Sequence, residues 1–392
     1  MGFALSTVDP SAELDDLEPL LDVVAGARVV AVGEANHCVR EFGLLRHRVI
    51  RLLVERAGFD VVAWESGFPE SWRVAEWVAG GAGDLDRVAR EGLCYRFGEV
   101  PEVRDVLGWL RGRGVGFAGV DLPGSGGSVG AVWPLVAEFA ERVGSGLPEL
   151  VARARSAVAE YAAVNSGLAL QRYAGLEESR RGAASEAVAE LSAWLAGFRP
   201  PVSLRERHAW VAHAVRGLVA ADRSLRELVA SEPVLAARDA YMAESVRWLL
   251  GRHRRVVVAV HNGHAQRVPL EFAGVAELRP MGVVLAEELG PEYRAVGVTA
   301  AGGGVTPGVE LDASAPQGIR LCSSPLPPVR EGSVEAWAGP GLVGVDLRGW
   351  DGAVGPQWIR HSDQYVATPV CAAFDGLLQV PGAVPSAPVP VG

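Results

Sequence analysis

A glutamate and a histidine stand three positions apart in this chain, at Glu34 and His37, directly after the apolar run 28–32. The run is short and rich in valine, which is typical of a central strand in a covered parallel sheet. Gly33 permits a sharp turn at its end. An imidazole held by a carboxylate can take a proton from water near neutral pH. The spacing therefore predicts an acid–base pair at a strand-to-helix corner.

Other polar residues also follow short apolar runs. They are Glu65 at the end of 60–65, Asp121 at the end of 116–121, and His261, Asn262 and His264 after 255–260. In open α/β sheets, ligands bind outside the carboxyl ends of the strands. We therefore expect these side chains to join Glu34 and His37 in one site. The remaining histidines that we considered are interpreted as packed or surface residues, because they lie in helical stretches: His47, His208, His213 and His253.

Apolar residues recur at helical spacing between most of these runs. The spacing predicts helices at 11–25, 38–57, 70–79, 84–91, 101–113 and 281–288, further strands at 293–299 and 342–347, and helices throughout 129–250. This order predicts an α/β fold with a mainly parallel central sheet flanked by helices and a large helical insertion. The expected parts are 1–128 (first part of the core), 129–250 (helical insertion or lid), 251–380 (rest of the core) and 381–392 (flexible tail).

Composition narrows the class of protein. The 392 residues carry a net charge of −10, which argues against a nucleic-acid partner. Lysine is absent, which excludes a Schiff-base or P-loop lysine. The four scattered cysteines fit reduced thiols, so we expect a cytoplasmic protein, and no apolar run is long enough to predict a membrane span.

The sequence contains features of other kinds of catalytic or binding site beside the acid–base pair. The spacing of His261 and His264, with the nearby carboxylates, leaves a zinc or manganese site open, although we favour no metal and no cofactor. The Gly-rich segment 122–128 matches neither common phosphate-binding pattern and is interpreted as a flexible loop at the mouth of the site. Cys38 is not favoured as a nucleophile, and no Gly-x-Ser-x-Gly elbow occurs.

The motifs carry a resemblance that spans nearly the whole chain. In order they are 33–42 (GEANHCVREF), 63–65 (AWE), 119–121 (GVD), 238–243 (RDAYMA), 260–264 (VHNGH) and 374–376 (FDG). This succession resembles the erythromycin esterase family, which includes macrolide-hydrolysing enzymes and proteins placed loosely in polysaccharide or secondary metabolism. Each motif is short, but their combined order is specific.

The resemblance implies a metal-independent esterase linked to antibiotic resistance or biosynthesis. It implies that His37 activates water as general base, that Glu34 and Glu65 orient and charge the site, and that His261 and His264 assist. We expect the substrate to be a small molecule contacted by Arg46, Asn36, Asp121 and Asn262. Because the site is rich in carboxylates, a cationic substrate such as an amino sugar is expected to be favoured.

Two residues depart from the family pattern, which usually has Thr at the position of Asn36 and Gly at that of Cys38. Three hypotheses therefore stay open. The first is hydrolysis of an ester or lactone in a polyketide-like molecule. The second is a biosynthetic enzyme that uses the same pair for dehydration, transesterification or cyclisation. The third is a non-catalytic protein that binds a small molecule, which would not need the full set of acids and histidines.

Overall fold

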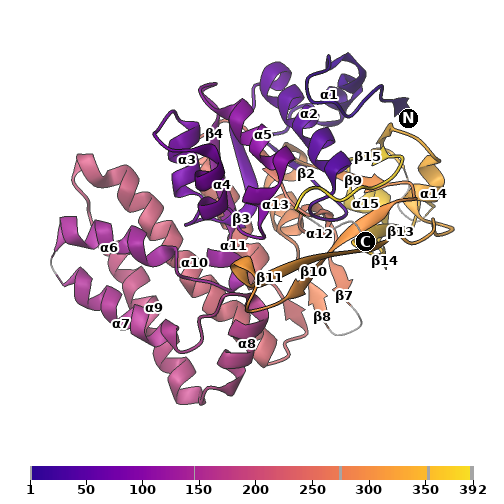
Figure 1. Ribbon diagram of the computed structural model, residues 1–392. Helices are drawn as coiled ribbons and strands as arrows, with labels where there is room; N and C mark the ends of the chain where they lie inside the picture. The colour runs from indigo at the N-terminus through magenta and orange to yellow at the C-terminus, as the bar shows by residue number, and fades with distance from the viewer. Residues whose placement is uncertain (1, 145, 273–275, 351–353, 389–392) are drawn as a thin grey trace.

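Eight strands form a central sheet in the computed structural model, which describes residues 2–144, 146–272, 276–350 and 354–388 (Figure 1). From one edge to the other they are β1 (Gly2–Ala4), β12 (Val343–Asp346), β15 (Gly376–Val380), β9 (Tyr293–Ala300), β2 (Val29–Val32), β6 (Val256–Ala259), β3 (Val61–Gly67) and β4 (Gly116–Asp121). The six strands from β15 to β4 are parallel, and β12 and β1 add to the edge in antiparallel fashion. The predicted α/β fold with a mainly parallel sheet is confirmed.

Strand β2 shows how the sheet is held between two apolar cores. All four of its residues are fully buried, because helices cover both faces. Val29 and Ala31 face one core, and Val30 and Val32 face the other. Five helices contribute buried side chains to the core that contains Val30: α1 (Pro19–Val23), α2 (Arg40–Ala57), α3 (Trp72–Val78), α4 (Leu85–Gly92) and α5 (Pro101–Leu110). Helices α11 (Ala237–Leu250) and α13 (Met281–Leu289) contribute to the opposite core.

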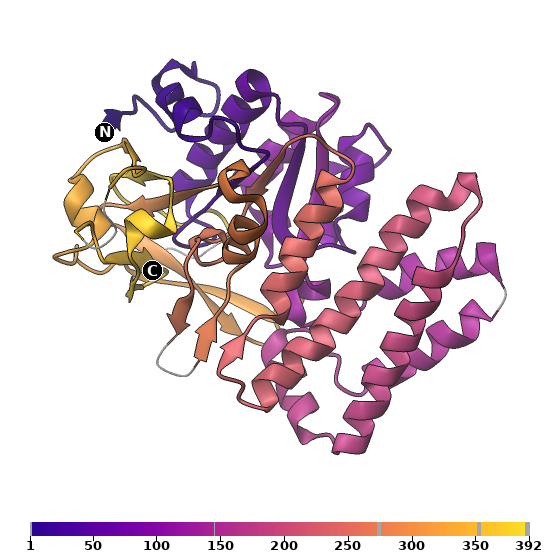
Figure 2. The ribbon, with the colours of Figure 1, turned by 180° about the vertical axis from the view of Figure 1, so that it is seen from behind.

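A group of helices lies to one side of the sheet, as Figure 2 shows from behind. They are α6 (Val132–Val143), α7 (Leu147–Ala159), α8 (Ser166–Gly175), α9 (Glu178–Gly197) and α10 (Arg205–Val229). They correspond to most of the insertion expected at 129–250. The last helix of that range, α11, packs instead against β4 and β6 and so belongs to the sheet layer. This position matters because α11 begins at the edge of the site.

The C-terminal third contains small sheets where the sequence indicated only loops. Two hairpins pair β10 (Val305–Leu311) with β11 (Ile319–Pro325), and β13 (Trp358–His361) with β14 (Gln364–Ala367). A third small sheet joins β5 (Val234–Leu235), β8 (Ala276–Leu278) and β7 (Leu270–Phe272). The short helices are η1 (Asp15–Leu17), η2 (Phe97–Glu99), η3 (Pro123–Gly126), η4 (Val202–Leu204), α12 (Asn262–Ala265), η5 (Gly290–Glu292), η6 (Pro316–Gly318), α14 (Val334–Ala338) and α15 (Val370–Ala373).

Three local predictions were wrong. The helix expected at 11–25 is split into η1 and α1, because Pro19 starts a new helix rather than continuing one. The segment 122–128 is packed rather than flexible, since it forms η3 and buries Ser125. The first part of the tail, predicted to be flexible, is held as far as Ser386, whose N–H donates to the Cys38 carbonyl at 2.8 Å. The last four residues of the tail, 389–392, lie outside the described residues.

None of the helices in the described part of the chain combines the length and the hydropathy needed to cross a bilayer.

Candidate active site

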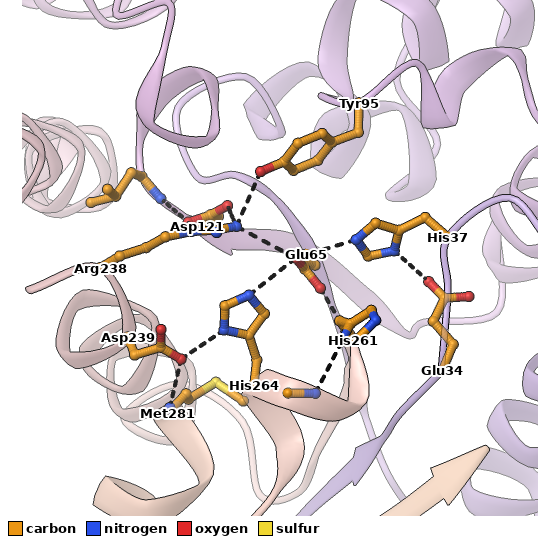
Figure 3. Close-up of polar contacts among 12 residues, drawn as sticks. Glu34, His37, Glu65, Tyr95, Asp121, Arg238, Asp239, His261, His264 and Met281 are labelled. Carbon is orange, nitrogen blue, oxygen red and sulfur yellow. Dashed lines mark hydrogen bonds and ion pairs between the residues drawn. The ribbon is translucent and has the colours of Figure 1, made fainter. Parts of the chain in front are cut away.

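A cavity of about 810 Å³ opens at the carboxyl ends of β2, β3 and β6. His37, Glu65, His261 and His264 line it together, and Glu34 lies directly behind His37 (Figure 3). The structure thus brings the five predicted catalytic candidates into one cluster. The reason is topological, because β2, β6 and β3 are neighbours and run parallel, so their ends meet at the same edge.

The turn after β2 places Glu34 and His37. Gly33 is required there for close approach, because a Cβ at this position would lie 2.0 Å from the side-chain oxygen of Asn262. Its backbone is not left-handed, so the turn predicted here is made without a positive φ, and the close approach to Asn262 is what excludes a side chain. Cys38 adopts the left-handed backbone instead, with φ +57°, which accounts for the glycine usual in the family at this position.

His37 is held between two carboxylates. Its Nδ1 donates to Glu34 Oε1 at 2.9 Å, and its Nε2 lies 3.6 Å from Glu65 Oε1. Burial by itself would lower the pKa of His37, but the charge of Glu65 and the hydrogen bond to Glu34 outweigh burial and raise the pKa to about 9. At neutral pH the imidazole is therefore mostly protonated. Its base form becomes abundant only in alkaline solution.

Glu65 is the centre of the cluster. It is 3% exposed, and its Oε2 accepts the backbone N–H of His261 at 2.6 Å. Its Oε1 faces three cationic groups, at 3.3 Å from His264 Nε2, 3.4 Å from an Arg238 nitrogen and 3.6 Å from His37 Nε2. Burial alone would raise the pKa of Glu65, but His264 and His37 hold the pKa well below its usual range. Glu65 therefore stays ionised and holds these cations in place.

His264 is a second protonated imidazole beside the cavity. Its Nδ1 donates to Asp239 Oδ1 at 2.7 Å, and Asp239 also caps α13 by accepting the Met281 N–H at 2.7 Å. Burial would lower the pKa of His264, but the charges of Asp239 and Glu65 raise it to about 10. His264 is therefore a proton donor at neutral pH rather than a base.

His261 is a neutral imidazole, in contrast to its two neighbours. Burial first, and then the charges of His361 and His37, keep its pKa well below the ordinary value. Its Nδ1 accepts the Gly263 N–H at 3.0 Å, so its Nε2 carries the proton and donates to the Ala35 carbonyl at 2.9 Å. Both ring nitrogens therefore serve the backbone. His261 therefore holds the turn, and its predicted part in the chemistry stays a prediction.

Three of the predicted substrate contacts do not line the cavity. Arg46 is 3% exposed and donates to Glu34 at 2.9 Å from behind, while its guanidinium lies over the Trp64 ring. Asp121 is fully buried and binds Arg238 through both of its oxygens, at 2.9 and 2.7 Å. Asn262 is 2% exposed and bonds the backbone of β9. These three side chains are buried and each bonds a protein partner, although the Arg46 Nε has no hydrogen-bond partner among the described residues.

Asn36 does line the cavity, but its amide is engaged. The Asn36 Nδ2 donates to the Thr306 hydroxyl at 2.7 Å and to the Pro307 carbonyl at 2.6 Å, both on β10. Asn36 therefore ties the hairpin to the turn that carries His37. Its predicted contact with a substrate stays a prediction.

Tyr95, Arg238, Asp239 and His361 also line the cavity and were not among the predicted site residues. Arg238 and Asp239 belong to a quoted motif, RDAYMA, and only their position at the start of α11 shows that they reach the site. The backbone of Tyr95 is left-handed, with φ +55°. Its ring stacks against the His37 ring, with ring centres 5.8 Å apart. Its hydroxyl accepts a hydrogen bond from Arg238 at 3.2 Å.

His361 comes from the β13–β14 hairpin and packs against His261, with ring centres 4.3 Å apart. Burial first, and then the charges of His264 and His37, lower its pKa to about 4. It is therefore neutral at physiological pH. A lone histidine in a loop-rich stretch carries no signal that could have placed it here.

The cluster around Glu65 contains equal numbers of carboxylates and cationic groups. Four carboxylates (Glu34, Glu65, Asp121 and Asp239) meet four cationic groups (His37, His264, Arg46 and Arg238). Glu310 and Asp363 also line the cavity, and the expected preference for a cationic substrate stays a prediction. Within the described residues, no group of three or more His, Cys, Asp or Glu side chains is arranged to hold a metal ion. The histidine nitrogens are directed at carboxylates or backbone groups instead.

Cys38 does not have the properties of a reactive thiol. It is 7% exposed, and burial followed by the charge of Glu34 raises its pKa to about 12. A thiol in this environment stays protonated and is a poor nucleophile.

Comparisons with known proteins agree with this geometry. The erythromycin esterase family model matches residues 54–381. The chain is 27% identical over 399 residues to erythromycin esterase type II of Escherichia coli, covering 95% of this chain and 93% of the relative. It is 26% identical over 392 residues to the type I enzyme of the same organism, covering 95% and 94%.

Two solved structures share the fold. A mutant of the erythromycin esterase EreC in its open conformation superposes with a TM-score of 0.84 at 23% identity, covering all of both chains. A succinoglycan biosynthesis protein superposes with a TM-score of 0.75 at 18% identity, covering 98% of this chain and 95% of that one. The motifs, the fold and the family match coincide over most of the length, and the chain belongs to the erythromycin esterase family.

Proposed function

We propose that this protein is a hydrolase that cleaves an ester or lactone of a polyketide-like small molecule by attack of water. The observation that carries the proposal is the pair Glu34 and His37 at the side of an 810 Å³ cavity, with Glu65 beside it. The two related Escherichia coli proteins are named as erythromycin esterases, which supports an ester as the reacting group.

In the proposed mechanism, His37 is the general base. With Nδ1 bonded to Glu34, the neutral imidazole presents the lone pair of Nε2 toward the cavity. Nε2 takes a proton from water as the water oxygen bonds to the carbonyl carbon. The imidazolium then returns this proton to the leaving alkoxide as the ester C–O bond breaks. The products are a carboxylic acid and an alcohol, and Glu34 and Glu65 stabilise the transient imidazolium.

The developing oxyanion needs donors that face the cavity. Arg46 was expected to serve, but it lies behind Glu34. His264 and Arg238 line the cavity and are both cationic at neutral pH, since the pKa of His264 is raised to about 10. We assign the oxyanion contact to these two residues. Preorganised donors of this kind contribute about 3 kcal/mol each to transition-state stabilisation.

Activity is expected to rise with pH toward about 9. Only the deprotonated form of His37 can accept a proton, so kcat/KM should increase about tenfold per pH unit below its pKa, level off near pH 9, and fall above about pH 10, where His264 loses the proton that serves the oxyanion. The Glu34→Gln variant removes a carboxylate that raises this pKa, so its rise should begin at lower pH. A pH profile of kcat/KM, with an NMR titration of the His37 ring, measures both effects. A wild-type profile that is flat across neutral and alkaline pH would contradict the role of His37.

Chelation is expected to leave activity unchanged. The proposal needs no metal, because water is activated by the imidazole and the oxyanion is met by His264 and Arg238. Rates before and after incubation with EDTA, together with elemental analysis of the purified protein, test this expectation. Stoichiometric metal, together with loss of activity that added metal restores, would replace this mechanism with a metal-assisted one.

The direct test of the function is mass spectrometry of a panel of macrolides and small lactones after incubation with the protein. A gain of one water that depends on His37 supports the hydrolase. Loss of water, or an isomer of unchanged mass, would instead assign the biosynthetic hypothesis. Unchanged compounds that nevertheless bind would assign the non-catalytic one.

A further inference from the structure

A second cavity of about 300 Å³ adjoins the first. Tyr95 and Val309 line both cavities, so the two spaces meet at these side chains. Tyr95 is the residue whose ring stacks on His37 and whose backbone is held in the left-handed region. A non-glycine residue in this conformation costs about 1–3 kcal/mol and persists where the surrounding structure requires it. We call the second space the side cavity.

The walls of the side cavity are largely apolar and come from distant parts of the chain. Leu93, Val164, Leu311 and Ile319 contribute from the α4–η2 connection, the approach to α8, and the β10–β11 hairpin. The hairpin reaches across to the helical insertion (Figure 1).

Two hydrogen bonds hold the tip of the hairpin across the side cavity. The Asn165 Nδ2 donates to the Gly318 carbonyl at 3.0 Å, and the Gln317 Nε2 donates to the Leu93 carbonyl at 3.0 Å. The cavity is therefore a formed space and not a gap between loosely associated elements.

A hydroxyl without a strong partner lies in the wall of the side cavity. Ser125 is 6% exposed, and apart from a weak contact with the Cys94 thiol its Oγ has no hydrogen-bond partner among the described residues. A buried hydroxyl in this state costs about 1–3 kcal/mol unless something bonds to it. Ser125 is also held in the left-handed region, with φ +49°, on the η3 turn, whose Gly124 N–H donates to Glu70 at 2.7 Å.

The charges around the side cavity favour a neutral ligand. Burial raises the pKa of Cys94 to about 12, so its thiol is uncharged, and raises the pKa of Glu70 to about 7, so much of this carboxyl is protonated at neutral pH. Glu91, which also lines the cavity, is paired with Arg73 at 3.3 Å and Arg87 at 2.9 Å. A full charge on the ligand would therefore have no free counter-charge among these groups.

We propose that the side cavity binds a neutral, ring-sized apolar branch of the substrate that carries a hydroxyl, while the ester itself lies at His37. The volume holds on the order of ten non-hydrogen atoms, at about 30 Å³ for a water-sized group. The apolar walls bury the ring, and the Ser125 hydroxyl, whose oxygen is covered by protein in this structure, turns about its Cα–Cβ bond to exchange a hydrogen bond with the ligand hydroxyl. This inference rests on the proposed function, because it assigns part of the substrate of the same site.

The first experiment compares acetate esters that carry a cyclohexyl ring, with or without a ring hydroxyl, on straight spacers of graded length. The straight-chain acetate of matched length is the reference. We expect one spacer length to give a kcat/KM at least about tenfold above the reference, since a methylene in an apolar pocket is worth about tenfold or more. The ring hydroxyl should increase the ratio further. A ratio near one at every spacer length would overturn the proposal.

Two variants locate the effect. Ser128→Trp places an indole at an exposed residue that lines the side cavity and should abolish the ring preference. Ser125→Ala should remove only the added benefit of the ring hydroxyl. The matched control is Ser179→Trp, an exposed position on α9, which should keep the wild-type ratio. A preference that survives Ser128→Trp would place the ring elsewhere and overturn the proposal.

Ligand binding separates this inference from the proposed function. Saturation-transfer NMR with cyclohexanol needs no turnover and can be run on the His37→Ala variant. We expect saturable binding that Ser128→Trp removes and Ser179→Trp retains. If no ester is hydrolysed but cyclohexanol still binds in this way, the proposed function is wrong and the proposal for the side cavity is supported. If esters are hydrolysed but cyclohexanol does not bind, only the proposal for the side cavity is wrong.

Discussion

Replacing His37 by alanine is expected to lower kcat by about a thousandfold or more while the fold is retained. Among the histidines that line the cavity in the described part of the chain, His261 uses both ring nitrogens for the backbone, and His264, with its pKa raised to about 10, releases its proton less readily than His37 does. General base catalysis supplies about a hundredfold to ten-thousandfold in rate. The His37 side chain is 20% exposed, and Glu34 keeps its partner Arg46 in the variant. The measurement is kcat on the ester found by mass spectrometry, with circular dichroism to check the fold.

A matched control is His253→Ala. His253 is partly exposed near Asp60, just before β3, and lies outside the cavity. This variant should keep wild-type activity and show that loss of a histidine does not by itself disturb the enzyme. A His37→Ala enzyme with near-normal kcat would end the assignment of water activation to this residue.

Replacing Glu65 by glutamine is expected to damage both activity and stability. The carboxylate is buried among His37, His264 and Arg238, and removal of its charge leaves these cations without their shared partner. Breaking a buried ion cluster in this way costs about 3–5 kcal/mol in the free energy of unfolding. We also expect kcat to fall about a hundredfold, because the positions of the base and of the oxyanion donors both depend on Glu65.

Urea unfolding and steady-state kinetics measure the two effects separately. Glu141→Gln is the matched control, since Glu141 is exposed on α6 and the same change of charge there should alter stability by less than about 0.5 kcal/mol. The pKa of His37 should fall in the Glu65→Gln variant, because the charge of Glu65 raises that pKa. A Glu65→Gln protein as stable and as active as the wild type would show that the cluster does not depend on this carboxylate.

The site shows why family membership does not decide the substrate. Asn36 and Cys38, which depart from the family pattern, both lie in the turn that carries His37. Asn36 ties this turn to β10, and Cys38 takes the left-handed backbone that a glycine adopts without strain. Both substitutions therefore affect the turn that positions His37, and Asn36 also affects how the β10–β11 hairpin is attached to this turn. The cavities beside the β10–β11 hairpin are lined by motif residues together with residues outside the motifs, such as Tyr95, Val309 and His361, and these are not specified by the motifs that define the family.

The sequence alone determined most of the central sheet and most of the candidate site. Valine-rich runs followed by acids or histidines are local signals, and parallel strands bring their carboxyl ends together whatever their order. For this reason Glu34, His37, Glu65 and His264 could be assigned to one site. The helical insertion was likewise visible in apolar spacing over a long range.

The tertiary structure alone decided which side chains face the cavity. Asp121 and Asn262 end their strands as predicted, but each points at a protein partner, because a buried polar group must be satisfied and the nearest donor or acceptor comes from a distant element. Arg238 reaches the cluster only because α11 packs on β4, and His361 only because a C-terminal hairpin folds over the strand ends. These contacts join residues that lie from 36 to 117 positions apart in the chain. Local spacing carries no information about them.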